Sequence, residues 1–159
     1  MTTPTAILLP RGEGRSYWVL GDLYTFKATG RETAGAYCLI EQEVGPQSGP
    51  PPHIHHAEEE AFYVLEGRFS FLCGEEERVV EKGGFAHIPR GMRHTFRNLG
   101  DSKGRLLVSI TPAGFEEFFF EIGSPAEKNS APPAADPEIL NRILQLAPAY
   151  HMEVLLPED

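Results

Sequence analysis

Four potential metal ligands at fixed spacing constrain this chain more than any other feature. His53 and His55 are separated by one residue, Glu60 follows five positions after His55, and His94 lies on a later stretch. Side chains two residues apart on a β-strand point to the same side, so His53 and His55 can face one space. Three imidazoles and a carboxylate form a mixed nitrogen and oxygen donor set that many transition metals accept. The spacing therefore predicts a metal site held by two separated strands.

Three consecutive acids, Glu58, Glu59 and Glu60, compete for the carboxylate position. Glu60 shares its strand face with Phe62 and Val64, which we expect to point inward. A carboxylate on an apolar face is costly unless a charged group meets it there. We therefore expect Glu60 to be the ligand and Glu58 and Glu59 to be solvated.

On the later strand, His94 has the same parity as Phe96 and Asn98, and the turn at 89–91 presents it. His56 has the opposite parity to His53 and His55 in the first stretch. We expect its side chain to point away from the site.

These two stretches resemble the paired motifs of the cupins, which read G-x5-H-x-H-x3–4-E-x6-G and G-x5-P-x-G-x2-H-x3-N. The second motif fits from Gly83 to Asn98 at every fixed position. In the first motif both histidines, Glu60 and Gly67 fit, but three residues instead of five separate Gly49 from His53. The C-terminal part also resembles single-domain cupins grouped with quercetin dioxygenases. The resemblance implies an all-β fold, an antiparallel double-sheet (jelly-roll) barrel with short C-terminal helices.

The chain divides into three expected regions. Residues 1–33 form an N-terminal arm and the first strands, residues 34–112 form the core barrel with both motifs, and residues 113–159 form a helical extension packing on the barrel. Short β-forming runs separated by turn residues are typical of such a sandwich or barrel. A tight turn is expected at Gly21-Asp22, and segment 6–9 is expected to be an edge strand or an arm. The expected strands are 16–20, 23–28, 34–44, 60–65, 68–73, 78–81, 85–88, 93–98, 105–111 and 152–156.

Helical periodicity begins after residue 112. The apolar residues of 115–122 recur at helical spacing with acids between them, which predicts a helix on the outside of the barrel or across its mouth. A second helix should begin with Asp136 as its cap and Pro137 in its first turn, and end at Pro148. The proline-rich segment 45–52 should be a loop, either one lip of the pocket or inert surface.

Composition bounds the classes of function. A chain of 159 residues suits one domain, and its net charge of -9 argues against binding to nucleic acid. Cys38 and Cys73 lie in apolar runs and are expected to be buried thiols, although a disulfide is left open. The first residues lack the basic start and apolar core of a signal peptide, and no apolar run is long enough to span a bilayer. We therefore expect a cytoplasmic protein without a membrane partner.

The donor set also predicts what the site can do. Three histidines and one glutamate leave one or two positions open on a five- or six-coordinate ion, unlike a closed structural zinc site. We expect one divalent transition metal ion per chain: Fe, Mn, Ni, Co, Cu or Zn. Phe62, Val64 and Phe96 should either line an apolar pocket around it or serve only as core residues. His87 shares parity with Phe85 and is expected at the pocket, as a proton carrier or as a rim residue.

The resemblance to quercetinase-like cupins implies a metal-dependent dioxygenase acting on a small enol or phenol. Glu60 would then be the catalytic base. Two alternatives stay open: a metal-dependent isomerase or lyase, and a non-catalytic barrel that binds or senses a small molecule. We also expect a homodimer that pairs through edge strands and uses segment 6–9, because a free β edge is a liability that dimerisation removes.

Overall fold

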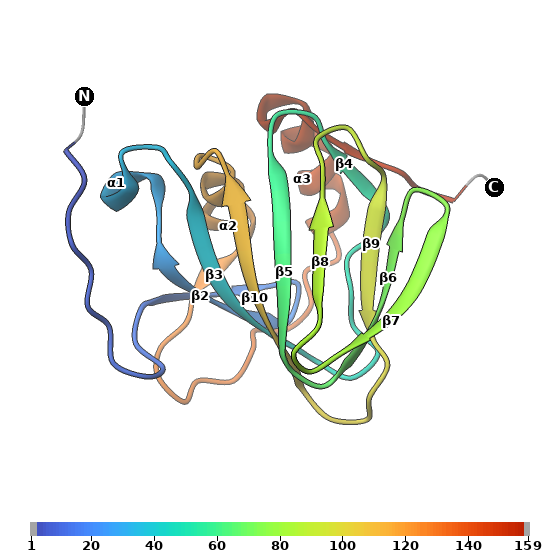
Figure 1. Cartoon of the computed structure of the whole chain (residues 1–159), viewed down its shortest axis with the longest axis horizontal. Helices are drawn as coiled ribbons and strands as arrows, with labels where there is room; N and C mark the ends of the chain where they lie inside the picture. Colours follow the sequence, from blue (N-terminus) through green and yellow to red (C-terminus); the bar gives the residue numbers. More distant parts are fainter. Residues whose placement is uncertain (1–2, 158–159) are drawn as a thin grey trace.

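Two antiparallel sheets make up most of the computed structural model, which describes residues 3–157 (Figure 1). They face each other as the two layers of a jelly roll, and among the described strands no pairing joins one sheet to the other, so they do not close into a continuous barrel. The seven-stranded sheet has the order β11 (Ser124–Pro125), β1 (Arg15–Val19), β2 (Asp22–Ala28), β3 (Cys38–Val44), β10 (Gly104–Thr111), β5 (Glu59–Glu66) and β8 (Phe85–Ile88). The five-stranded sheet has the order β12 (Met152–Val154), β4 (His53–His55), β9 (His94–Asn98), β6 (Arg68–Cys73) and β7 (Glu76–Glu81). The expected all-β fold class is confirmed.

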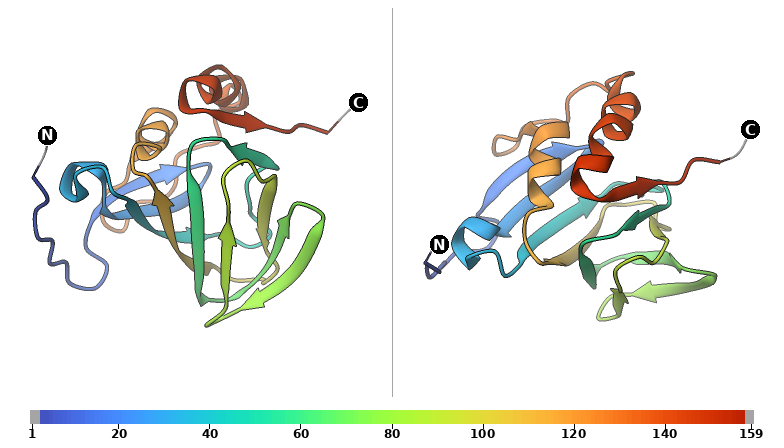
Figure 2. Two further views of the ribbon diagram at one scale, coloured as in Figure 1. Left: turned by 45° about the horizontal axis from the view of Figure 1, so that its top comes forward. Right: turned by 90° about the horizontal axis from the view of Figure 1, so that it is seen from above.

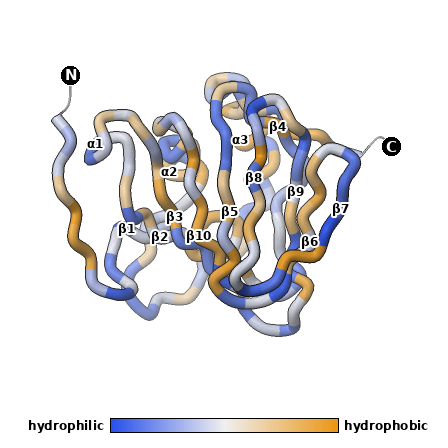
Figure 3. The backbone as a smooth tube through the Cα atoms, in the orientation of Figure 1, coloured by the Kyte–Doolittle hydropathy of each residue, from blue (hydrophilic) through white to orange (hydrophobic). Residues whose placement is uncertain are grey.

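Strict alternation of buried and half-exposed residues along the central strands builds the core. In β3 and β10 every second side chain is buried, as expected for strands with one face on a core. Between the sheets the rings of Phe62, Phe69, Phe71 and Phe96 pack with centroids 5.4–6.3 Å apart. The strongly hydrophilic colouring of β7 in Figure 3 matches its position at the exposed edge of the five-stranded sheet.

The C-terminal helices cover the part of the larger sheet that the smaller sheet does not reach (Figure 2). Helix α2 (Glu116–Ile122) lies over β1 and β2, with Phe120 against Tyr17 at 4.8 Å and Phe119 against Tyr24 at 5.1 Å between ring centroids. Helix α3 (Ile139–Leu146) buries Ile143 and continues into a 3-10 turn, η1 (Ala147–Tyr150). Strand β12 then pairs with β4, so the chain returns from its helices to the strand with two of the predicted ligands.

Two glycines fix the loops beside the ligand strands. A Cβ atom on Gly49 would lie 1.9 Å from the carbonyl oxygen of Phe96, so this loop tolerates no side chain where it crosses β9. Gly91 has a φ of 78°, which favours glycine, and its N–H donates to the carbonyl of His55 at 2.9 Å. Gly49 therefore lets the loop before β4 cross β9, and Gly91 ties the turn before β9 to the end of β4.

Several local expectations are corrected. The first tight turn is centred on Leu20 and Gly21, both with positive φ, because Val19 pairs with Asp22 in the ladder. Of the two forms expected for segment 6–9, an edge strand or an arm, the structure shows the arm: no strand is assigned there, and Thr5 donates its N–H to the carbonyl of Glu32.

The helices also differ from expectation, by one additional short helix and by the two ends of the last one. A short helix, α1 (Gly30–Thr33), precedes β3, and its capping box joins Thr29 and Glu32. The second C-terminal helix begins at Ile139, although Asp136 accepts the N–H of Glu138 at 2.9 Å as a cap would. Pro148 does not end the helical path, since it lies in the first turn of η1.

Both cysteines are free: Cys38 is buried and Cys73 is partly buried. Across residues 3–157, none of the helices combines the length and the apolar character that crossing a membrane requires.

Candidate metal centre

Strands β4 and β9 deliver three histidines to one place. His53 and His55 are the two buried residues of β4, on either side of a half-exposed isoleucine. His53 pairs directly with His94 of β9, and their ring centroids lie 4.3 Å apart. The period of a strand and one cross-strand pair therefore bring three imidazoles together.

Glu60 reaches the same place from the opposite sheet. The residue is 5% exposed, and its two carboxylate oxygens lie 3.1 Å from Nε2 of His55 and 3.0 Å from Nε2 of His94. One potential ligand atom from each of His53, His55, Glu60 and His94 lies within 4.8 Å of the other three. The structure thus brings all four residues singled out in the sequence into one cluster.

The outer nitrogens of two histidines are already engaged. Nδ1 of His53 donates to the carbonyl of Pro51 at 2.8 Å, and Nδ1 of His94 donates to the carbonyl of Met92 at 3.0 Å. In a neutral imidazole whose Nδ1 carries the proton, Nε2 is a bare lone pair. For His94 that lone pair would face a carboxylate oxygen, an arrangement that is repulsive unless a proton or a cation lies between them. Backbone carbonyls holding the outer nitrogen are typical of histidines that bind metals, so the cluster fits a cation.

The electrostatics of the cluster favour the ligand forms. Burial, reinforced by the charges of His94 and His55, lowers the pKa of His53 to about 3, so its imidazole is neutral at neutral pH. Burial raises the pKa of Glu60, but the charges and hydrogen bonds of His55 and His94 outweigh it and hold that pKa well below the usual value. A neutral imidazole and an ionised carboxylate are the forms that bind divalent ions.

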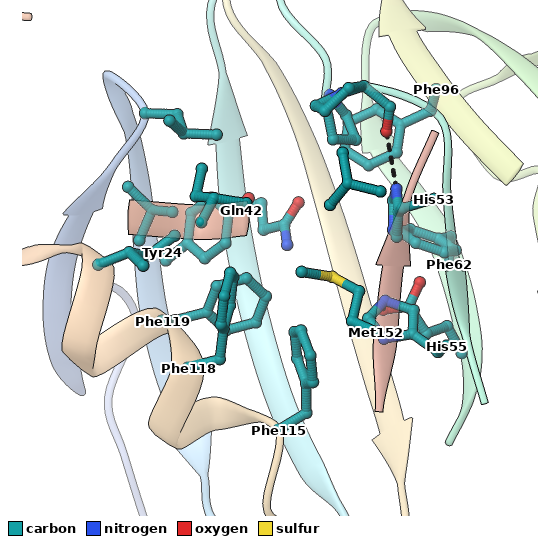
Figure 4. Close-up of a pocket in the computed structure, with 18 residues that line it drawn as sticks. Tyr24, Gln42, His53, His55, Phe62, Phe96, Phe115, Phe118, Phe119 and Met152 are labelled. Carbon is teal, nitrogen blue, oxygen red and sulfur yellow. Dashed lines mark hydrogen bonds and ion pairs between the residues drawn. The ribbon is translucent and has the colours of Figure 1, made fainter. Parts of the chain in front are cut away.

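The cluster closes one end of an apolar pocket (Figure 4). Helix α2 forms the facing wall with three phenylalanine rings, and Phe115 contacts His55 edge-on with ring centroids 4.4 Å apart. The lining residues are Val19, Leu20, Tyr24, Gln42, Pro50, Pro51, His53, His55, Glu60, Phe62, Phe96, Phe115, Phe118, Phe119, Ile122, Ile143, Met152 and Val154.

The predicted pocket residues separate into two groups. Phe62 and Phe96 line the pocket, whereas Val64 is buried in the core between the sheets. His87 does not reach the pocket: its side chain is 49% exposed, with Nε2 3.7 Å from the carboxylate of Glu59. Strand β8 buries Ile88 and exposes Phe85 and His87, so the inward face is the opposite of the one expected.

The expectation that both acids beside Glu60 are solvated is also corrected. Glu59 is partly exposed, with 46% of its side chain accessible, but Glu58 is 8% exposed and its Oε2 lies 3.9 Å from Nδ1 of His55. Neither of these two atoms has a hydrogen-bond partner. His56 points outward and pairs with Glu153 at 3.0 Å.

Sequence reasoning missed several pocket residues. It recognised the phenylalanine face of α2 but left its position open, and the structure places that face in the same pocket as the donor cluster. The loop 45–52 contributes Pro50 and Pro51, so it forms a lip. Gln42 and Tyr24 were not recognised, although a glutamine at an inward position of β3 was a visible signal.

Comparison with known proteins shows which family this chain resembles. The profile described as "Cupin domain" matches residues 40–110. Quercetin 2,3-dioxygenase of Bacillus subtilis (strain 168) is 29% identical over 94% of this chain and 44% of its own length. Quercetin 2,3-dioxygenase of Aspergillus japonicus is 31% identical over 75% of this chain and 36% of its own length. The chain therefore spans less than half the length of these two relatives.

The fold has close counterparts among solved structures. The structure of KdgF from Halomonas sp. aligns with a TM-score of 0.62 at 14% identity, covering 71% of this chain and 98% of that one. At this identity the likeness concerns the fold alone. With paired histidine motifs, a two-sheet jelly roll and these relatives, the chain belongs to the cupins and resembles the quercetin 2,3-dioxygenases.

Proposed function

We propose that this protein is a metal-dependent dioxygenase that acts on a small enol or phenol. One divalent transition metal ion (Fe, Mn, Ni, Co, Cu or Zn) would bind to His53, His55, Glu60 and His94. The geometry of the four donors supports the ion, and the likeness to two quercetin 2,3-dioxygenases supports the class of reaction.

The observation that carries this proposal is the junction of the donor cluster with the pocket. His53, His55 and Glu60 belong to the cluster and also line the pocket. A ligand in the pocket would therefore meet the ion directly, which a closed structural site does not allow. When bound, a transition metal ion supplies Lewis acidity toward an enol or phenol oxygen, together with redox chemistry.

Glu60 is the acidic residue among those that line the pocket. In this proposal one of its carboxylate oxygens accepts the proton of the substrate hydroxyl, leaving the substrate as an enolate or phenolate. His55 and His94 lie beside the two oxygens of Glu60, at 3.1 and 3.0 Å, and reach them from different strands. Together with an ion bound by all three residues, they would limit the positions that the carboxylate can take.

The walls of the pocket favour a planar, largely apolar substrate. The rings of Phe115, Phe118 and Phe119 face Phe62 and Phe96 across the cavity (Figure 4). Aromatic side chains stack on or pack edge-on against planar ligands and exclude water from the reacting end.

The test is oxygen uptake by protein loaded separately with iron, manganese, nickel, copper, cobalt or zinc, over a panel of flavonols and diketones. We expect one or more metals to support oxygen consumption with a dioxygenated product. His94→Ala and Glu60→Gln should abolish it, while the outward His56→Ala keeps it.

Each other outcome has a distinct meaning. Tight binding without oxygen consumption, for every metal and substrate, would replace the proposal with a small-molecule-binding protein. Product formation without oxygen consumption would instead indicate an isomerase or a lyase.

A further inference from the structure

Gln42 places an amide oxygen without a hydrogen-bond partner in the pocket. Its side chain is 4% exposed, it lines the pocket, and its Oε1 has no hydrogen-bond partner. Figure 4 shows the amide directed into the space between the α2 phenylalanines and His53. A buried polar atom without a partner destabilises a fold, so its presence calls for an explanation.

Other buried polar side chains near β3 do have partners. The hydroxyl of Thr25 lies 2.9 Å from that of Ser16. The amide of Asn98 donates to the carbonyls of Val44, Gly45 and Ser102. These two side chains have hydrogen-bond partners in the fold, whereas Oε1 of Gln42 has none; the two other buried atoms without a partner, Nδ1 of His55 and Oε2 of Glu58, face each other beside the donor cluster.

The position of Gln42 relative to the donor cluster sets the size of what it can contact. Strand β10 lies between β3 and β5, so two strand spacings, about 10 Å, separate the strands of Gln42 and Glu60. Along the strands the two residues are offset, because Gln42 is level with Leu106 and Glu60 with Ile110. A ligand of two or three fused or linked rings spans such a distance.

Tyr24 is the cross-strand neighbour of Gln42 and also lines the pocket. The remaining walls at this end come from apolar residues such as Val19, Leu20 and Ile122. A ligand group with a hydrogen to donate therefore finds its acceptor at Gln42, with the phenol of Tyr24 beside it.

We propose that Gln42 selects the ligand: its Oε1 accepts a hydrogen bond from a hydroxyl at the end of the ring system opposite the enol held at the donor cluster. The position of the enol at the donor cluster rests on the proposed function. The substrate class is thereby narrowed to aromatic enols that carry a distal hydroxyl. A site whose buried acceptor waits for a hydroxyl discriminates against analogues that lack it.

The test uses two probes that differ in one group, 3-hydroxyflavone and its 4′-hydroxylated analogue. Their binding to metal-loaded protein is measured by absorbance titration, without oxygen. We expect the wild type to bind the hydroxylated probe about tenfold more tightly or better. In Gln42→Leu, which removes the amide and keeps the bulk, the two probes should bind equally.

Thermal unfolding of the ligand-free protein separates selection from a structural role. Gln42→Leu should melt at the same temperature as the wild type or higher, because it removes an unpartnered buried group. The matched control Thr25→Val removes a satisfied hydroxyl, so it should melt lower and keep the preference for the hydroxylated probe.

The inference and the proposed reaction can fail separately. Equal preference in wild type and Gln42→Leu, or no binding of either probe to the wild type, overturns the inference. A lower melting temperature for Gln42→Leu with the preference intact also overturns it. Loss of the preference in Gln42→Leu supports it even if no metal supports oxygen consumption, and in that case the proposed reaction alone is overturned.

Discussion

The carboxylate of Glu60 lies 3.0 Å from Nε2 of His94, although Glu60 belongs to the seven-stranded sheet and His94 to the five-stranded sheet. The donor cluster is therefore a link between the two layers of the fold. An ion that binds only the folded protein stabilises it by RT ln(1 + c/Kd), where c is the concentration of the free ion and Kd is its dissociation constant. Loading with metal should raise the melting temperature, and chelation should lower it.

The first prediction concerns which acid holds the ion. Glu60→Gln should strongly reduce the metal bound per chain, because the amide that replaces the carboxylate carries no charge and one oxygen fewer. Glu59→Gln, whose side chain is about half exposed, is the matched control and should retain the metal. Elemental analysis after dialysis measures both. Equal losses in the two variants would contradict the assignment.

The second prediction concerns Glu58. Its buried carboxylate faces Nδ1 of His55 at 3.9 Å, and neither atom has another partner. Metal bound at Nε2 makes the Nδ1 proton more acidic and strengthens its attraction to a carboxylate. We expect Glu58→Gln to weaken metal affinity about 10- to 100-fold, the range typical of such outer partners.

Competition titration with a chromophoric chelator measures that affinity. Glu59→Gln, at the half-exposed side chain, again serves as the control. Unchanged affinity in Glu58→Gln would show that this carboxylate does not position His55.

The third prediction concerns the loop that crosses β9. Gly49→Ala would place a methyl group 1.9 Å from the carbonyl oxygen of Phe96, so the loop or the strand must move. We expect a loss of about 1–3 kcal/mol in the free energy of unfolding, as for other overpacked sites, and weaker metal binding because β9 carries His94.

Gly45→Ala in the same loop is the control, because its added Cβ would meet nothing closer than 3.4 Å. Urea denaturation compares the two variants. Equal stabilities would show that the loop adapts without cost.

The fourth prediction is a pH dependence outside the pocket. Glu41 accepts from Nε of Arg105 at 3.0 Å and lies 3.6 Å from Nζ of Lys27. Burial raises the pKa of Glu41, but these cations outweigh it and hold the pKa below its usual value. Its stabilisation is therefore present above about pH 4.5 and is lost as the pH falls through the lower folded-state pKa.

Glu41→Gln should thus lower the free energy of unfolding by about 0.5–1 kcal/mol at neutral pH. The difference from wild type should vanish in acid. Denaturation curves over a pH series measure it, with the exposed turn residue Glu75→Gln as control. A difference that persists in acid would mean that packing, not charge, is responsible.

The fifth prediction concerns assembly. Leu8 is 92% exposed on the N-terminal arm, whose hydrophobic stretch is visible in Figure 3. We expect a homodimer that covers this arm, and Leu8→Glu should shift it toward monomer. Light scattering measures the mass, and Leu156→Glu near the other end of the described chain is the control. A wild type at monomer mass in dilute solution would contradict the prediction.

Side-chain directions were predicted best inside β-strands, where alternate residues point to opposite faces. His53, His55 and Glu60 each lie inside a strand whose neighbours alternate, so parity alone indicated their direction. Glu58 lies just before β5 begins, yet it continues the alternation of buried Glu60 and Phe62, so the expectation that it is solvated was wrong. For His87, parity was taken from Phe85, an aromatic residue that is exposed in the structure.

The pocket depends on contacts between distant parts of the chain, which periodicity does not encode. Tyr24 and Gln42 become neighbours through the register of β2 and β3. The face of α2 was readable as apolar, but the sheet surface that it covers follows from how far each sheet extends. Such long-range arrangements need the three-dimensional structure.

The pairing of β12 with β4 has a mechanical consequence. Met152 and Val154 line the pocket and at the same time lie opposite His55 and His53 in the ladder. The backbone that carries two of the four donors is therefore tethered to the segment that follows the helices. A molecule that displaces β12 as it enters the pocket would also displace β4 through their shared backbone pairing. Its entry would therefore change the distances of His53 and His55 from the other two donors.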